Sequence, residues 1–271
     1  MLYKQETIHV NNQANDVEMT LYLLDNNEEV DENRVRPLVI ICPGGGYEFR
    51  SFREAEPVAV RLLSMGYHAA VLHYDVAPQV FPSQLLQLLA SIHHVRANAE
   101  NWHVDPDRIV LMGFSAGGHL AASAGVFWMR PYYAQLLGLT NEDVRPNALV
   151  LAYPVITSGP FTHQGSMDNL MGEDREKYLY TVSLEKQVKP EVPPTFLWHT
   201  VEDADVPVEN SMMFASALRK AGVPFEMHLY QKGEHGLSLS NEEVYGPAWQ
   251  HNITPACQGW LQMMDTWYRN L

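Results

Sequence analysis

A serine between glycines is the first residue of this chain with a recognisable chemistry. Ser115 is the centre of Gly-Phe-Ser-Ala-Gly at 113–117, which follows the strand-like run 108–112 and opens the apolar segment 116–129. A serine held at a sharp strand-to-helix turn, a nucleophile elbow, needs small residues two positions before and after it, because larger ones would make strand and helix collide. A plain glycine-rich turn is the alternative. The flanking strand and helix favour a nucleophilic Ser115.

A serine hydroxyl is a poor nucleophile until a neighbouring base takes its proton. Of the 12 histidines, His235 is the best candidate, because glycines at 233 and 236 place it in a loop just after the strand-like run 225–230. No second histidine lies nearby at a metal-ligand spacing, so we expect no metal site. His119 follows Ser115 by four residues on the same predicted helix, and its side chain should run along that helix.

A carboxylate is needed to fix the tautomer of the histidine and to stabilise the imidazolium that forms during acyl transfer. Glu202, Asp203 and Asp205 all follow the predicted strand 195–198. We prefer Asp203. The resulting chain order, serine then acid then histidine, differs from the orders of two other common serine-hydrolase types.

A glycine-rich loop could stabilise the negative charge that develops on a carbonyl oxygen. Pro-Gly-Gly-Gly-Tyr at 43–47 follows a predicted strand, and glycines let backbone amides point into a cavity without side chains in the way. We expect an oxyanion hole made by the amides of Gly45, Gly46 and Ala116, with Tyr47 as the alternative to Gly46. A phosphate-binding loop is the competing interpretation, but neither G-x-G-x-x-G nor G-x-x-x-x-G-K-[ST] is present.

The elements that must position these residues can be recognised from hydrophobic patterning. Unbroken apolar runs indicate parallel strands covered by helices on both faces. They lie at 37–41, 69–72, 109–112, 148–152 and 195–198. Helices are predicted between and after them at 54–65, 82–101, 116–129, 209–221 and 246–270. Alternation at 5–10 and 17–24 predicts an N-terminal antiparallel hairpin at the sheet edge. The fold class is therefore α/β, with a mostly parallel central sheet.

One segment departs from this alternation of strands and helices. Residues 157–194 are rich in Gly, Ser, Pro and charge, so we predict an irregular excursion over one end of the sheet, where such segments often build a substrate pocket. The chain shows no internal repeat and no composition shift, and we expect a single domain over 1–271. The candidate pocket side chains are Tyr47, Tyr74, Phe161 and His163.

Composition limits the classes of partner. The 271 residues include 18 Lys and Arg against 32 Asp and Glu, a formal charge of −14, which disfavours binding to nucleic acid or to an anionic membrane. No apolar run approaches the roughly 20 residues of a membrane span, and residues 1–10 are too polar for a signal peptide, so we expect a cytoplasmic protein. Cys42 and Cys257 lie in apolar surroundings and are expected to be buried and reduced. The sequence leaves homo-oligomer formation open.

Taken together, the motifs resemble those of the α/β-hydrolase superfamily, and within it the small esterases described as acetyl-xylan-esterase-like or sugar-ester hydrolases. The likeness runs from about residue 37 to the C-terminus and rests on the motifs at 43–47, 74–78, 113–119, 203–207 and 235–236. In that family the acid begins a D-x-x-V-P pattern, which Asp203 fits and Asp205 does not. Many relatives carry histidine where this chain has Pro43.

The resemblance implies the α/β-hydrolase fold and a serine carboxylic-ester hydrolase that needs no cofactor. We expect small soluble esters as substrates, because the chain has no long apolar lid, with acetylated sugars or xylo-oligosaccharides as the plausible class. A serine exopeptidase or lactonase using the same triad is the first alternative. The segment 203–236 also resembles prolyl-oligopeptidase-type peptidases, but about 36 residues before the first parallel strand are too few for a propeller blade of roughly 40. The second alternative is a non-catalytic ligand-binding protein of the same fold.

Overall fold

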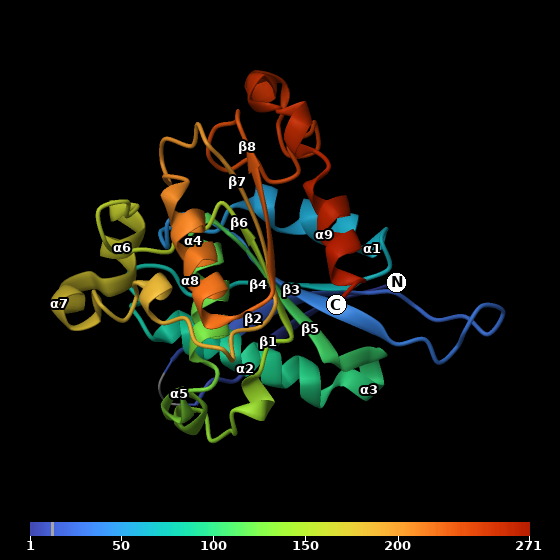
Figure 1. Cartoon of the computed structure of the whole chain (residues 1–271). Coiled ribbons are helices and arrows are strands. Elements are labelled where there is room, and N and C mark those ends of the chain that lie inside the picture. Colours follow the sequence, from blue (N-terminus) through green and yellow to red (C-terminus); the bar gives the residue numbers. More distant parts are fainter. Residues whose placement is uncertain (12–13) are drawn as a thin grey trace.

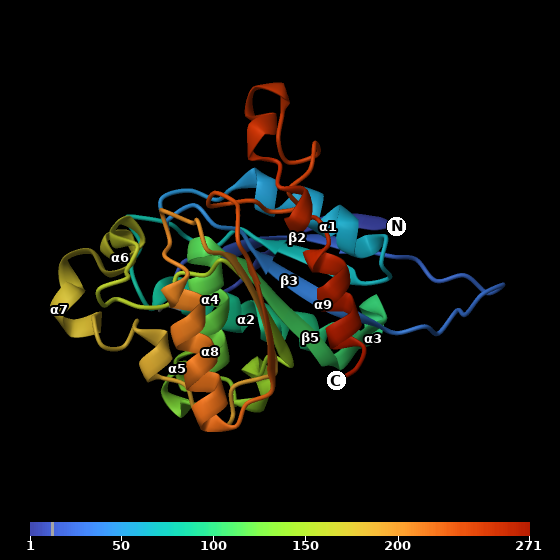
Figure 2. The same cartoon turned by 45° about the horizontal axis from the view of Figure 1, so that its top comes forward.

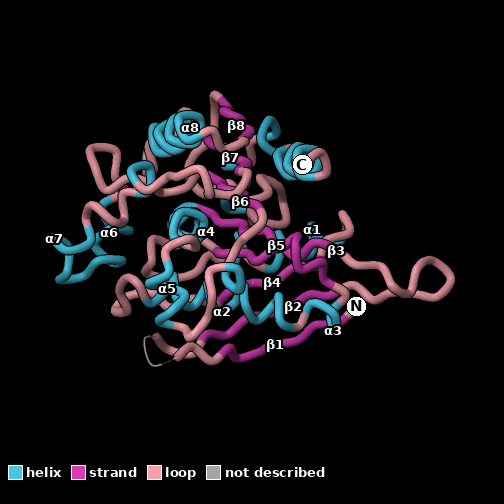
Figure 3. The backbone as a smooth tube through the Cα atoms, turned by 60° about the horizontal axis from the view of Figure 1, so that its bottom comes forward, coloured by secondary structure: helices cyan, strands magenta, loops and turns pink. Residues whose placement is uncertain are grey.

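The computed structural model describes residues 1–11 and 14–271 and contains one eight-stranded sheet (Figure 1). The strands are β1 (Leu2–Ile8), β2 (Val17–Leu23), β3 (Arg36–Cys42), β4 (His68–Leu72), β5 (Val104–Phe114), β6 (Ala148–Ala152), β7 (Thr195–Thr200) and β8 (Phe225–Tyr230). Their order is β1-β2-β4-β3-β5-β6-β7-β8. The first two neighbouring pairs are antiparallel and the remaining five are parallel. This confirms the predicted α/β fold and the N-terminal hairpin, which forms one edge of the sheet in Figure 3.

Helices cover both faces of the sheet. They are α1 (Glu56–Leu63), α2 (Ser83–Ala97), α3 (Ala99–Trp102), α4 (Ser115–Phe127), α5 (Pro131–Leu136), α6 (Gln164–Met171), α7 (Arg175–Tyr178), α8 (Glu209–Ala221) and α9 (Trp260–Tyr268). Figure 1 shows α1 and α9 on one side of the strands, with α4 and α8 on the other. Alternate residues of β3 enter opposite cores: Leu38 and Ile40 join one apolar cluster, and Val39 and Ile41 join the second. Burial on both faces explains why the parallel strands carry unbroken apolar runs.

Three predicted segments differ from the structure. The predicted helix 82–101 is divided into α2 and α3 at Asn98. The predicted helix 246–270 is α-helical only in α9, and the preceding segment, which projects away from the sheet in Figure 2, forms 3-10 turns that begin at Pro247 and Pro255. Proline lacks the N–H that an α-helix interior requires. The excursion 157–194 is not irregular throughout, since it contains α6 and α7.

Both cysteines are buried and free, as predicted. Cys42 ends β3 within the first apolar cluster, and Cys257, which ends the 3-10 turn that begins at Pro255, belongs to the second cluster. Within residues 1–11 and 14–271, no helix has the length and apolar character required to cross a bilayer.

Candidate active site

The strand order brings two distant loops together. β3 pairs in parallel with β5, and Cys42 lies opposite Gly113 at their carboxyl ends. The chain moves from β3 outward to β4 and then returns to the other side of β3 to form β5, so the order of strands reverses here. In open α/β sheets, ligands bind outside the carboxyl ends of the strands at such a reversal. The loop 43–47 and Ser115 therefore leave the sheet side by side.

Ser115 is the first residue of α4 and has a left-handed backbone conformation with φ of +52°. The glycines around it are required by close backbone contacts. A Cβ added at Gly113 would lie 2.2 Å from the carbonyl oxygen of Gly117, and one added at Gly117 would lie 2.1 Å from that of Cys42. Both contacts are far shorter than atoms tolerate, so the turn is a tight strand-to-helix elbow, as the motif predicts.

The structure brings the three predicted triad side chains together. The His235 Nε2 atom lies 2.8 Å from the Ser115 Oγ atom, and its Nδ1 atom lies 2.7 Å from Asp203 Oδ2. The other carboxylate oxygen of Asp203 accepts the backbone N–H groups of Asp205 and Val206, at 3.1 and 2.9 Å. With the proton on Nδ1 facing the carboxylate, Nε2 is left free to accept the serine proton.

Asp203 is buried, and its surroundings favour the carboxylate form. Burial alone would raise the pKa of Asp203, but hydrogen bonds from His199 and His235, the charge of His235 and the Val206 N–H together bring it below the usual range. The Nε2 atom of His199 lies 3.3 Å from Asp203 Oδ2 and 3.0 Å from the carbonyl oxygen of Val206. His199 was not predicted from the sequence, although it lies in β7, the strand that precedes the Asp203 loop.

The glycine-rich loop presents free backbone amides. The amide of Gly44 donates to Glu54 Oε2 at 2.8 Å and is therefore occupied. Within the described part of the chain, the amides of Gly45, Gly46 and Tyr47 have no acceptor. All three residues have positive φ, at +123°, +66° and +57°. The amide of Ala116 lies in the first turn of α4, where helix N–H groups have no intrahelical partner.

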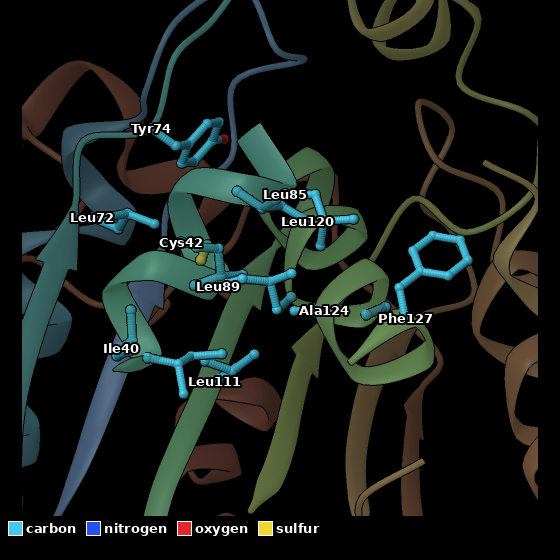
Figure 4. Close-up of a cluster of buried hydrophobic side chains, with 14 of the residues drawn as sticks. Ile40, Cys42, Leu72, Tyr74, Leu85, Leu89, Leu111, Leu120, Ala124 and Phe127 are labelled. Atoms are coloured by element: carbon cyan, nitrogen blue, oxygen red, sulfur yellow. The ribbon is translucent and has the colours of Figure 1, made fainter. Parts of the chain in front are cut away.

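Tyr47 and Tyr74 do not lie where a substrate could stack on them, which corrects the prediction that their rings line a pocket. Their exposed fractions are 1% and 0%. The Tyr74 hydroxyl donates to the carbonyl oxygen of Pro43 at 2.5 Å, and its ring lies among the core side chains in Figure 4. The Tyr47 hydroxyl donates to His119 Nδ1 at 2.9 Å. Tyr74 therefore bonds to the start of the glycine-rich loop, and Tyr47 joins the end of that loop to α4.

The excursion places His163 near the triad. His163 is half-buried and caps α6, with its Nδ1 accepting the Ser166 backbone N–H at 3.2 Å, so the neutral ring carries its proton on Nε2. Burial, and then the charge of His235, lower the pKa of His163. Asn169 from α6 donates to the carbonyl oxygen of Gly46 at 2.9 Å, which ties the excursion to the glycine-rich loop. Phe161, the remaining candidate for the pocket, lies in the same excursion and is 39% exposed, so its side chain is accessible.

His119 is a buried residue whose two ring nitrogens both form hydrogen bonds, so it has a structural role rather than that of the base. Its Nε2–H donates to the carbonyl oxygen of Val182 at 2.9 Å, and its Nδ1 accepts the Tyr47 hydroxyl. The imidazole therefore joins the excursion to the glycine-rich loop. Burial lowers the pKa of His119 to about 4, even though its hydrogen bond to Val182 opposes the shift.

This burial predicts a pH-dependent stability. Between about pH 6.5 and pH 4 the unfolded chain binds a proton at His119 that the folded chain does not, so the free energy of unfolding falls as the pH falls through this window. Across this whole window the free energy of unfolding should fall by about 3 kcal/mol through His119. Urea unfolding of the wild type and of His119→Gln at pH 7 and pH 4.5 measures it. The variant should lose less stability on acidification, whereas equal losses in the two proteins would contradict the assignment.

Comparison with known proteins places these features among esterases. The sequence model of the BD-FAE family matches residues 21–218. Endo-1,4-beta-xylanase B of Butyrivibrio fibrisolvens is 38% identical over 220 residues, which cover 78% of this chain and 34% of that protein. Acetylxylan esterase of Xylanibacter ruminicola is 29% identical over 215 residues, covering 77% and 42% respectively. The chain therefore spans less than half the length of either of these relatives.

Solved structures match over nearly the whole chain. A carboxylesterase from Lactobacillus plantarum has a TM-score of 0.88 and 31% identity, and the match covers 100% of this chain and 98% of that one. An acetyl ester-xyloside bifunctional hydrolase from Caldicellulosiruptor lactoaceticus has a TM-score of 0.76 and 38% identity, with 92% and 88% covered.

Proposed function

The chain belongs to the BD-FAE family of α/β-hydrolases, and from this premise we propose that it is a serine carboxylic-ester hydrolase that works through an acyl-enzyme. The hydrogen-bonded series Ser115, His235 and Asp203 carries the proposal, because it supplies a nucleophile, a base and an orienting acid in one line. A protein that only bound a ligand would have no need of this arrangement, which counts against the non-catalytic alternative.

The proposed reaction has two stages. The Ser115 Oγ atom attacks the ester carbonyl carbon while its proton passes to His235 Nε2, and the carbonyl π electrons move onto the oxygen. The amides of Gly45, Gly46 and Ala116 donate hydrogen bonds to that oxyanion. Each donor stabilises the transition state by on the order of 3 kcal/mol. Collapse of the intermediate expels the alcohol, which takes the proton from His235. Water then attacks the acyl-serine in the same way, releasing the acid and restoring Ser115.

Small acyl groups suit the site best. Ser115 is only 6% exposed and the His235 side chain 17%, which favours a small ester over a bulky one. The Butyrivibrio, Xylanibacter and Caldicellulosiruptor proteins are described as a xylanase, an acetylxylan esterase and an acetyl ester-xyloside hydrolase. We therefore propose acetyl esters, with acetylated sugars or xylo-oligosaccharides as the substrate class and the His163 Nε2–H as a donor to the bound substrate.

A substrate panel tests this proposal. The purified protein is assayed on p-nitrophenyl acetate, butyrate and octanoate, on acetylated xylo-oligosaccharides, on a lactone, and on an aminoacyl p-nitroanilide. We expect kcat/KM to be highest for acetyl esters and to fall at least about tenfold by octanoate, because a nucleophile as buried as Ser115 accommodates a short acyl chain more easily than a long one. Faster turnover of the anilide or the lactone would favour the exopeptidase or lactonase alternative, and no turnover of any ester would refute the proposal.

A further inference from the structure

A buried carboxylate outside the triad lies beside the nucleophile. Glu54 is 3% exposed and belongs to the 3-10 turn η1, Phe52–Glu54. Within the described residues it forms no ion pair, so its burial must be offset by hydrogen bonds alone. The elbow, the base and the orienting acid do not use it.

Glu54 accepts one hydrogen bond from the glycine-rich loop and one from Tyr153, which follows β6 and is bonded in turn by the loop that carries His235. Its Oε2 atom accepts the Gly44 N–H at 2.8 Å, and its Oε1 atom accepts the Tyr153 hydroxyl at 2.7 Å. The oxygen of Tyr153 in turn accepts the Ser238 backbone N–H at 2.8 Å. The Tyr153 ring packs edge-on against the His235 imidazole, with 5.1 Å between ring centroids. One carboxylate therefore connects the glycine-rich loop to the loop that carries the base.

Glu54 is also close to the nucleophile itself. A Cβ added at Gly44 would lie 2.7 Å from Glu54 Oε2 and 3.0 Å from the Cβ of Ser115, so a single methyl group would fill the space between the carboxylate and the serine. Glu54 occupies the Gly44 amide, and the next two amides of the loop, those of Gly45 and Gly46, have no acceptor within the described residues.

The backbone conformations at these loops need such support. In the described chain six residues other than glycine have positive φ, namely Tyr47, His103, Ser115, Tyr153, Ser238 and Ser240. Only His103 lies away from the loops around the triad, at the start of β5. Left-handed backbone at such residues costs about 1 to 3 kcal/mol each and persists only where the surroundings impose it. Tyr153 and Ser238 are two of them, and they bond directly to each other.

We infer that Glu54 is a positioning residue: through Gly44 and Tyr153 it fixes the distance between the oxyanion amides and His235 that acylation of Ser115 requires. The inference rests on the proposed function. A displacement of about 1 Å at a reacting centre can lower a rate on the order of 10²-fold. Loss of Glu54 should therefore slow the chemical step while substrate binding changes little.

Three substitutions test the inference with p-nitrophenyl acetate. Glu54→Ala removes the acceptor of the Gly44 N–H and of the Tyr153 hydroxyl, and we expect kcat to fall on the order of 10²-fold with KM almost unchanged. Glu54→Gln keeps an oxygen for the Gly44 N–H and offers its amide N–H to the Tyr153 oxygen, so it should recover most of the lost kcat. Tyr153→Phe breaks only the branch to the histidine loop and should give an intermediate loss. Phenylboronic acid, which forms a tetrahedral adduct with an active serine, should bind each variant more weakly by the factor lost in kcat/KM.

Asp265 supplies a matched control. It is another buried carboxylate, 8% exposed, that accepts a tyrosine hydroxyl, from Tyr67 at 2.6 Å, but it lies on α9 away from the triad. Asp265→Ala should lower the melting temperature and leave kcat and boronate binding unchanged. Two results would overturn the inference on Glu54, provided that the wild type is active. One is a loss of kcat in Glu54→Ala and Tyr153→Phe no larger than in Asp265→Ala, and the other is a Glu54→Gln variant as slow as Glu54→Ala. An inactive wild type would instead refute the proposed function itself, and this inference with it.

Discussion

Replacing Ser115 with alanine should lower kcat for p-nitrophenyl acetate by a factor on the order of 10⁴ to 10⁶, because the bond-forming oxygen is removed and only binding and the oxyanion amides remain. The fold should be retained, since the Ser115 hydroxyl makes its only hydrogen bond within the described chain to His235. Measuring kcat together with thermal unfolding separates loss of chemistry from loss of structure.

Ser123 offers the control for this substitution. It is buried in the same helix, α4, and lies two turns beyond the nucleophile. Ser123→Ala should keep kcat within about twofold of the wild type. A core substitution away from the reacting groups changes the free energy of unfolding and leaves the chemical step unchanged. Retention of more than a tenth of the wild-type rate by a clean preparation of Ser115→Ala would contradict the assignment of the nucleophile.

Replacing Asp203 with asparagine should lower kcat by about 10⁴-fold, the loss expected when the base is held in the wrong tautomer. The structure dictates which way the asparagine amide faces. Backbone N–H groups of Asp205 and Val206 hold one carboxylate oxygen of Asp203, so the asparagine oxygen must occupy that place. The amide nitrogen then faces His235 Nδ1 and donates to it, which moves the imidazole proton to Nε2. A protonated Nε2 cannot accept the proton of Ser115.

Asp205 is the matched control for this second substitution. Its side chain is exposed, and within the described residues it forms no hydrogen bond or ion pair with His235. Asp205→Asn should leave kcat within a few fold of the wild type, as most exposed substitutions do. If Asp203→Asn loses less than tenfold, or if the two variants lose activity equally, the orienting role belongs to another group.

The three side chains that meet at the candidate site could be found from the sequence because each follows a strand end within a short motif. Ser115 is marked by its flanking glycines, and His235 by the loop glycines around it. The D-x-x-V-P pattern of the family that the chain resembles distinguishes Asp203 from Asp205 as the acid. The strands themselves are readable because burial on both faces requires unbroken apolar runs, and α8 begins and ends where its pattern predicts, at Glu209 and Ala221.

The supporting residues could not be found in this way, because their partners are distant in the chain. Glu54 reaches Tyr153 across 99 positions, and Tyr47 reaches His119 across 72, and no local spacing reports such contacts. The prediction that Tyr47 and Tyr74 line the pocket rests on residue type and on a place in loops near the site, and neither distinguishes a ring that faces substrate from a buried ring. The predicted helix 246–270 is a different kind of error, because Pro247 and Pro255 mark the breaks in the sequence itself.

Labelling with a fluorophosphonate probes the proposed chemistry most directly, since this reagent reacts only with a serine whose proton a neighbouring base removes. Digestion of the labelled protein and mass spectrometry should find the adduct on Ser115 in the wild type, and none in His235→Ala. An adduct on a different residue, or an unlabelled folded protein that still hydrolyses esters, would show that Ser115 is not the nucleophile.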